Sequence, residues 1–171
     1  MPAKAEIPSR LRRRPKDDRG YPIPFIAAFG PNGEPDFRIM STSRVLECVN
    51  QRRCGLCGQP MSRIVYFIGG PESERTRSFL DPAMHHDCAV YALKTCPHLA
   101  MAKSHYSRAA LPAGTRTAES ASAEKMDRFG LFKTTGYHAR QADGEIAIKA
   151  EPWLEVTWWK EGKPLAAAPA G

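Results

Sequence analysis

The sequence contains no run of apolar residues long enough to span a membrane, which takes about 18 in succession. Its first twenty residues are rich in charge and lack the apolar stretch of a secretory signal. Aromatic residues make up only 9% of the 171 residues, and no internal repeat is visible. We therefore expect a soluble, cytoplasmic protein with one main core, and neither a membrane protein nor a repeat protein.

The common catalytic motifs are missing as well. The chain has no G-x-S-x-G nucleophile motif, no G-x-x-x-x-G-K-[ST] phosphate loop and no G-x-G-x-x-G dinucleotide fingerprint. These absences argue against nucleophilic hydrolysis and nucleotide chemistry, so a non-enzymatic role is expected.

Acidic residues are in the minority: 25 Lys and Arg face 18 Asp and Glu, which gives a net charge of +7. Most of the excess lies in residues 1–19, with seven basic and three acidic side chains. Such a segment can neutralise phosphates as a cationic strand, or it can serve only as a solubilising tail. The candidate nucleic-acid contacts are the basic residues of this arm and those around the first cysteine pair: Arg10, Arg12, Arg13, Arg14, Lys16, Arg52, Arg53 and Arg63.

Cysteines are few and odd in number, five in all, which argues against a disulfide framework. Cys54 and Cys57 form a C-x2-C pair, and further along the chain His85 and Cys88 form an H-x2-C pair. Two such pairs supply four borderline-soft ligands, the donor set that tetrahedral Zn2+ prefers. The spacing therefore predicts a structural Zn2+ site at these four residues.

Two other uses of this site are less favoured. A redox dithiol at Cys54 and Cys57 would require a helix after the second cysteine, and Gly58-Gln59-Pro60 opposes one. A metal-dependent nuclease or hydrolase is a remote alternative, because four protein ligands leave no position for a reactive water.

The remaining cysteines and the second histidine also need an interpretation. Cys48 and Cys96 lack a partner at ligand spacing and are interpreted as buried thiols. His86 is the alternative ligand to His85, because a shift of the helix start by one residue would exchange the two. We favour His85, which lies three residues before Cys88 on the same face of the expected helix.

The segments around the ligand pairs have predictable structure. Residues 45–51 favour a helix and residues 61–68 a strand. Asp-Pro at positions 81 and 82 is typical of a helix start, so we expect a helix over 81–95 that carries the second ligand pair. Upstream, residues 23–29 and 36–40 flank a Gly-Pro-Asn-Gly turn and predict a hairpin.

We call the turn that carries the first cysteine pair, Cys54-Gly55-Leu56-Cys57-Gly58, the knuckle. The order of knuckle, strand, loop and helix resembles the treble-clef zinc finger over Arg53 to Pro97. The resemblance implies an α+β fold in which hairpin, knuckle, strand and helix form a small zinc-binding module. It implies no single function, since DNA binders, nucleases, ribosomal proteins and protein-interaction modules share this scaffold. The longer pattern from Gly20-Tyr21-Pro22 to Cys96-Pro97-His98 is also similar to bacterial and phage proteins of unknown function, and that likeness implies no activity.

The C-terminal part has a different composition. Thirteen of the 19 residues in 107–125 are Ala, Ser, Thr, Gly or Pro, which predicts a linker. Beyond it, residues 137–140 and 145–149 flank an Asp-Gly turn and predict a hairpin. In a third strand Leu154, Val156 and Trp158 alternate with residues that include Trp159, so we expect these three to face inward and Trp159 to lie on the open side. Three short strands hardly stand alone, so the antiparallel β-meander should dock on the zinc-binding module.

The expected organisation has five parts: a basic flexible arm at 1–19, a zinc-binding domain at 20–106, a flexible linker at 107–128, a β-meander at 129–161 and a disordered tail at 162–171. The function expected from these parts is that of an accessory protein whose zinc stabilises the fold while arm and finger bind DNA or RNA. The alternative is a protein-interaction or structural module. Binding that weakens steeply with salt would favour the first.

Overall fold

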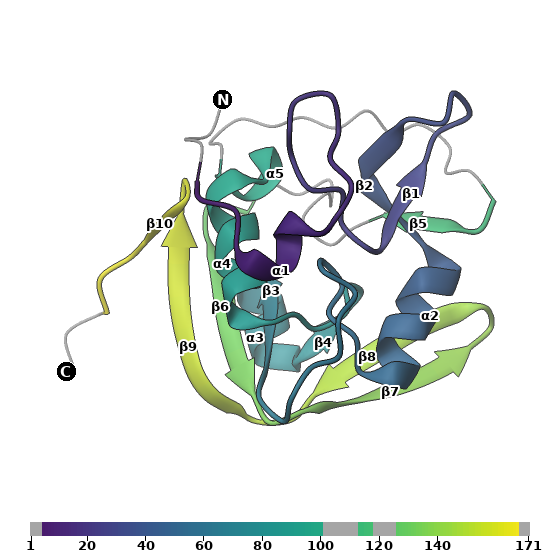
Figure 1. Cartoon of the computed structure of the whole chain (residues 1–171). Helices are drawn as coiled ribbons and strands as arrows, with labels where there is room; N and C mark the ends of the chain where they lie inside the picture. Colours follow the sequence, from purple (N-terminus) through teal and green to yellow (C-terminus); the bar gives the residue numbers. More distant parts are fainter. Residues whose placement is uncertain (1–4, 101–112, 118–125, 168–171) are drawn as a thin grey trace.

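The structure is a computed structural model that describes residues 5–100, 113–117 and 126–167. It is an α+β fold with antiparallel sheets and a C-terminal β-meander (Figure 1). The helices are α1 (Ser9–Arg12), α2 (Thr42–Gln51), α3 (Pro71–Thr76), α4 (His86–Thr95) and α5 (Pro97–Ala100). The strands are β1 (Ala27–Phe29), β2 (Pro35–Ser41), β3 (Val65–Gly69), β4 (Ser78–Phe79), β5 (Thr115–Thr117), β6 (Phe129–Thr134), β7 (Tyr137–Ala142), β8 (Glu145–Ala150), β9 (Trp153–Lys160) and β10 (Lys163–Pro164).

The central sheet joins residues 20–100, which carry the candidate metal ligands, to the C-terminal region. Its strand order is β10-β9-β6-β3, and β3 pairs with β6 along its whole length, from Val65 opposite Thr134 to Gly69 opposite Gly130. This pairing confirms that the meander docks on the part of the chain that carries the candidate metal ligands. Two smaller sheets, β1-β2-β5 and β4-β8-β7, complete the fold.

Strands β6 to β9 form one long, bent hairpin (Figure 1). Its tip confirms the predicted turn: Asp143 and Gly144 have φ values of 52° and 78°, as the tight turns that suit a hairpin require. β7 pairs with β8 near the tip, and β6 pairs with β9 nearer the base. At the bend the register shifts next to Thr134, whose hydroxyl donates a hydrogen bond to the Glu151 carbonyl at 3.0 Å.

The burial of β9 differs from the predicted alternation at two residues. Leu154 is 55% exposed, because it is the extra residue at the register shift: Trp153 lies opposite Thr134 and Glu155 opposite Lys133. Trp159, expected on the open side, is only 8% exposed. Trp158 packs against one cluster of buried side chains and Trp159 lies in another, so a simple inward and outward alternation does not describe this end of the strand.

Two clusters of buried side chains lie on the two faces of the central sheet, as expected from the period of two along a strand. We call the cluster that includes residues of helix α4 the α4 core, and the one rich in rings the aromatic core. The α4 core contains Leu11, Cys54, Cys57, Ile68, Met84, Cys88, Ala89, Tyr91, Leu93, Leu99, Phe129, Leu131 and Trp159. The aromatic core contains Met40, Val45, Val49, Val65, Phe67, Phe79, Ala83, Phe132, Ile146, Ile148 and Ala150.

Helix α4 begins at His86, and the prediction of a start at Asp81 is wrong. Met84 forms an antiparallel bridge with Tyr66, in which the two backbone N–H groups donate to the opposite carbonyls at 2.8 and 2.9 Å. The Gly55 N–H also donates to the Ala83 carbonyl at 3.1 Å. These sheet-like hydrogen bonds hold the segment extended, so His85 becomes the residue that precedes the first turn. The helix ends at Thr95, as predicted.

The other elements predicted for the zinc-binding region are present with shifted ends. The helix expected at 45–51 begins earlier, as α2 at Thr42, and the strand expected at 61–68 is the shorter β3. The expected hairpin is formed by β1 and β2, which pair antiparallel with a register shift after Ala27. Among the described residues no helix has the length and apolar composition needed to cross a bilayer.

The described part of the basic arm, residues 5–19, lies against the fold. Helix α1 places Leu11, 2% exposed, in the α4 core, and the Ile23 N–H donates to the Pro15 carbonyl at 2.8 Å. One leucine thus provides an apolar anchor that the average composition of the arm conceals. Within the expected linker, β5 pairs with β2, while residues 107–112 and 118–125 lie outside the described part of the chain. Residues 1–4 of the arm and 168–171 of the tail also lie outside it.

Candidate metal centre

Four side chains converge at the junction of the knuckle and helix α4. One ligand atom from each of Cys54, Cys57, His85 and Cys88 lies within 4.8 Å of all the others. Cys54 and Cys88 are fully buried, and Cys57 is nearly so. Tetrahedral Zn2+, with bonds of about 2.3 Å to sulfur and about 2.0 Å to nitrogen, requires ligand atoms roughly 3.5–3.8 Å apart. The cluster that the spacing predicts is thus assembled, and its donor set is compatible with Zn2+.

The first pair sits on a tight turn that only glycine can complete. The Gly58 N–H donates to the Cys54 carbonyl at 2.8 Å, and the Cys54 N–H donates to the Gln59 carbonyl at 2.9 Å. Gly58 has φ +74°, and a Cβ there would lie 2.6 Å from the Phe25 ring. Both the backbone angle and the close contact exclude a side chain at this position.

The His85 ring is oriented by a backbone carbonyl. Its Nδ1 lies 3.3 Å from the Cys57 sulfur, and its Nε2 lies 3.1 Å from the Pro60 carbonyl oxygen. Because a carbonyl can only accept, Nε2 carries the proton and Nδ1 remains the ligand atom. Metal-binding histidines commonly have such a second partner, which sets the tautomer and the ring orientation.

Hydrogen bonds among these groups shift their pKa values. Hydrogen bonds with Cys54 and Cys88 lower the pKa of Cys57, whereas hydrogen bonds with Cys54 and Cys57 raise the pKa of His85 to about 10. The same two neighbours also raise the pKa of Cys88. The shared protons occupy the lone pairs that a dication would use, so metal binding at this cluster releases protons.

The donor set is of the kind found in structural metal sites. Three thiolates and one neutral imidazole complete a tetrahedral shell and leave no position for water. With a dication the site carries a net charge near −1, which weakens its power to acidify water. The nearest acid, Asp87, pairs with Arg10 at 3.5 Å and accepts a hydrogen bond from the Cys88 N–H at 3.1 Å. It is thus engaged in holding α1 and α4 together.

The other cysteines and His86 lie outside the cluster. Cys48 is fully buried, its thiol donates to the Cys54 carbonyl at 3.9 Å, and burial raises its pKa to about 12. Its interpretation as a buried thiol is confirmed. Cys96 is partly buried and packs against the α4 core. The His86 ring packs on Tyr66, with 4.9 Å between the ring centroids.

Three of the eight predicted nucleic-acid contacts donate hydrogen bonds to backbone carbonyls. Arg53 donates to the Gly58 carbonyl at 2.9 Å, and Arg52, which ends α2 with φ 52°, donates to the Ser62 carbonyl at 3.1 Å. Arg14 donates to the Ile23 carbonyl at 2.9 Å, and burial together with nearby Arg44 lowers its pKa. These half-buried guanidinium groups are occupied by backbone carbonyls.

The other five basic residues are exposed. Arg10 pairs with Asp87, and Arg12 pairs with Glu6 at 3.0 Å. Lys16 donates to the Arg12 carbonyl at 3.3 Å. Arg13 and Arg63 have no acidic partner within the described ranges, so they and Lys16 are the cations most available to a ligand.

Sequence reasoning missed the residues that support the ligands. The Phe25 ring lies between Arg14 and Arg44, whose guanidinium carbons are 5.5 and 4.7 Å from its centroid, and it packs on Gly58. The carbonyl of Pro60 orients His85. Neither residue stands at a sequence spacing that relates it to the ligands. Among the residues that support the ligands, only Arg53 could have been found from the sequence, because it directly precedes Cys54.

No protein family, curated protein or solved structure matches this chain. The chain is therefore characterised by its own fold and site, as an α+β protein with a buried Cys3His cluster compatible with Zn2+.

Proposed function

We propose that the chain is a non-enzymatic accessory protein in which Cys54, Cys57, His85 and Cys88 hold a structural Zn2+ and exposed cations beside the site bind nucleic acid. The observation that carries this proposal is the set of four converging ligands, of which the three cysteines are buried and His85 is partly buried. A site of this kind stabilises a scaffold and leaves binding to the surface around it.

The arrangement around the ligands supports a treble-clef-like module. The knuckle follows α2, β3 follows the knuckle, and the second ligand pair stands at the start of α4. The bridge between Arg53 and Pro60 closes the knuckle, and the bridge between Tyr66 and Met84 ties β3 to the segment that precedes the helix.

The nucleic-acid part of the proposal rests on the position of the arm. Helix α1 lies beside the knuckle, where the Gln59 side chain donates to the Arg10 carbonyl at 3.5 Å. This brings the exposed residues Arg13 and Lys16 to the zinc-binding region, which also carries Arg63. If these three cations each contact a phosphate, a plot of the logarithm of the binding constant against the logarithm of the salt concentration should have a slope of about −2 to −3.

Binding of a 20-base-pair DNA duplex and of single-stranded DNA and RNA, measured at 50 and 200 mM salt, tests the proposal. We expect affinity for at least one of them to fall about 15- to 60-fold over this range. The triple variant Arg13→Ala/Lys16→Ala/Arg63→Ala should lose most of the binding and of the salt dependence. A matched control replaces three exposed C-terminal cations, Arg140→Ala/Lys160→Ala/Lys163→Ala. Salt-independent binding, or an equal loss in the control, would contradict the proposal.

One observation favours a protein-interaction module as the second candidate. Strand β7 lies at the edge of its sheet, and residues 138–142 are all exposed. An open edge strand can pair with a strand of another protein. If this candidate holds, Ala139→Pro abolishes binding to a partner protein while the triple cation variant retains it.

A further inference from the structure

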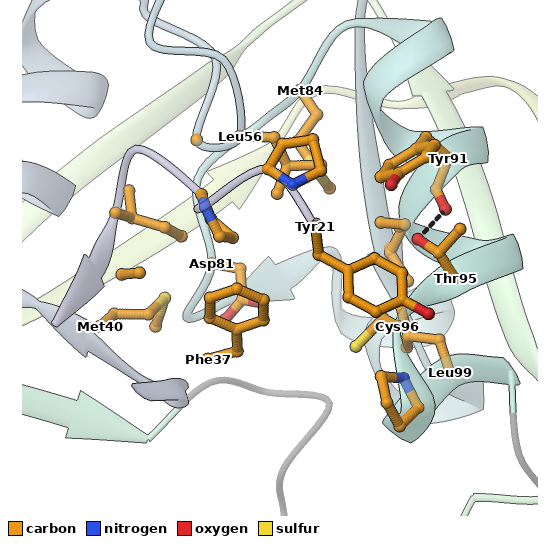
Figure 2. Close-up of a pocket in the computed structure, with 18 of the residues that line it drawn as sticks. Tyr21, Phe37, Met40, Leu56, Asp81, Met84, Tyr91, Thr95, Cys96 and Leu99 are labelled. Atoms are coloured by element: carbon orange, nitrogen blue, oxygen red, sulfur yellow. Dashed lines mark hydrogen bonds between the residues drawn. The ribbon is translucent and has the colours of Figure 1, made fainter. Parts of the chain in front are cut away.

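A cavity separate from the metal cluster lies between the β1–β2 hairpin, the knuckle and helices α4 and α5 (Figure 2). Its volume is about 140 Å³. Protein interiors seldom contain voids much larger than a water molecule. In an engineered protein, an apolar cavity of about 150 Å³ stays free of water and admits benzene. The cavity is thus large enough for one small aromatic molecule.

The lining is mainly apolar and includes Pro22, Ile26, Phe37, Leu56, Met84 and Leu99. The few polar groups include two that can interact with a ligand. Thr95 donates its hydroxyl hydrogen to the Tyr91 carbonyl at 2.7 Å, so its oxygen can still accept. The Tyr21 hydroxyl forms no hydrogen bond within the described part of the chain, and Figure 2 shows its ring among the side chains that line the cavity.

Among the described residues, the one cation in the lining is Arg19, and it is already neutralised. Arg19 pairs with Asp17 at 2.7 Å, and its guanidinium carbon lies 5.3 Å from the centroid of the Tyr21 ring and 5.7 Å from that of Phe37. Arg19 therefore holds two rings of the wall in place and offers little charge to an anion. Asp81 also lines the cavity and disfavours a negative ligand. The ligand that fits this lining is neutral.

We propose that this cavity binds one small, neutral aromatic molecule that carries a hydroxyl or N–H group, of the size of phenol or indole. The ring lies among the apolar side chains, and its polar group forms a hydrogen bond with the Tyr21 hydroxyl. Such a site combines an apolar pocket with a few polar groups that set orientation, as small-molecule sites generally do. This proposal does not depend on nucleic-acid binding.

Titration calorimetry of the zinc-loaded full chain with phenol, toluene and benzoate tests the proposal. We expect phenol to bind about tenfold more tightly than toluene, because toluene leaves the polar groups unpaired. Benzoate should bind at least tenfold more weakly than phenol. No binding of phenol, or equal binding of the three, would overturn the proposal.

Two variants locate the ligand. Ala92→Phe places a ring in the cavity and should abolish binding of both phenol and toluene, whereas Lys94→Phe, on the exposed side of the same helix, should leave it unchanged. Tyr21→Phe should bring the affinity for phenol within about threefold of that for toluene without loss of toluene binding. If Ala92→Phe fails to fold, the Tyr21→Phe variant still tests whether phenol binds in this cavity. Unchanged phenol binding in both variants would place the ligand elsewhere and contradict the proposal.

Discussion

The α4 core and the aromatic core lie on opposite faces of the same sheet and are held together in different ways. The aromatic core is built from rings in contact: Phe67 and Phe79 stack with centroids 4.4 Å apart, and Phe132 and Trp153 with centroids 4.8 Å apart. The α4 core has three cysteines among its buried residues, and they belong to the candidate metal centre. One face is therefore held by packing alone, and we propose that the other also depends on a metal.

This difference has a physical reason. Residues 53–60 form a turn with few side chains to bury, and the segment before α4 is held by only a few backbone hydrogen bonds. A structural zinc site contributes about 10–16 kcal/mol in small zinc-binding peptides, and this energy becomes folding energy. Aromatic side chains instead stabilise a core through their buried area and through many smaller ring contacts. Variants that disrupt one core at a time therefore test whether the two cores are stabilised in different ways.

Loss of the metal should have the largest effect. Cys88→Ser, or removal of zinc by a chelator, should unfold the knuckle and the start of α4, because an incomplete ligand set binds Zn2+ far more weakly. Backbone amides of residues 53–60 and 85–90 should then exchange hydrogen rapidly, whereas amides of β6 should still exchange slowly. Cys96→Ser is the control and should retain one zinc per chain. Equal zinc loss in both variants would show that the ligand assignment is wrong.

A large cavity in the aromatic core should come second. Phe132 is fully buried, and Phe132→Ala should lower the free energy of unfolding by about 3–5 kcal/mol, measured by urea denaturation. The purified variant should keep one zinc per chain, because the ring lies in the aromatic core and not among the ligands. Zinc loss in a folded Phe132→Ala protein would mean that the two cores are not separate.

A smaller effect is expected at the knuckle turn. Gly58→Ala should cost about 2–4 kcal/mol and weaken zinc binding, since the added Cβ combines a left-handed φ with a clash against Phe25. The matched control is Gly144→Ala, with φ +78° and no atom within 4 Å, which should cost about 1 kcal/mol and leave zinc affinity unchanged. Similar results for the two would indicate that the knuckle adapts to a side chain.

The smallest effect is expected where α2 meets the long hairpin. The Tyr137 hydroxyl lies 3.2 Å from the Val49 carbonyl and 3.4 Å from the Cys48 carbonyl, to which it can donate. Tyr137→Phe should lower the free energy of unfolding by about 1 kcal/mol, measured by thermal denaturation, with no change in zinc content. A loss above about 3 kcal/mol would show that this contact matters more than one hydrogen bond.

The ligand cluster could be predicted from the sequence because its information is local. Residue type and the x2 spacing within each pair define the donors, and the tip of the long hairpin is likewise defined by Asp143 and Gly144. The docking of the meander could be predicted from its small size. These features depend on a few neighbouring residues or on a general rule.

The features that could not be predicted depend on distant partners. The Asp81-Pro82 cap signal was overridden because Met84 pairs with Tyr66. The exposure of Leu154 depends on a register shift at the bend of the hairpin. Leu11 lies among arginines, and its burial depends on helix α4, far away in sequence. No local sequence pattern predicts these contacts.

X-ray absorption spectroscopy at the zinc edge of the purified full chain tests the central claim most directly. The account predicts one zinc per chain, with three sulfur ligands at about 2.3 Å and one nitrogen ligand at about 2.0 Å. A chain that purifies without stoichiometric metal, or a shell with fewer than three sulfur atoms and a bound water, would contradict it.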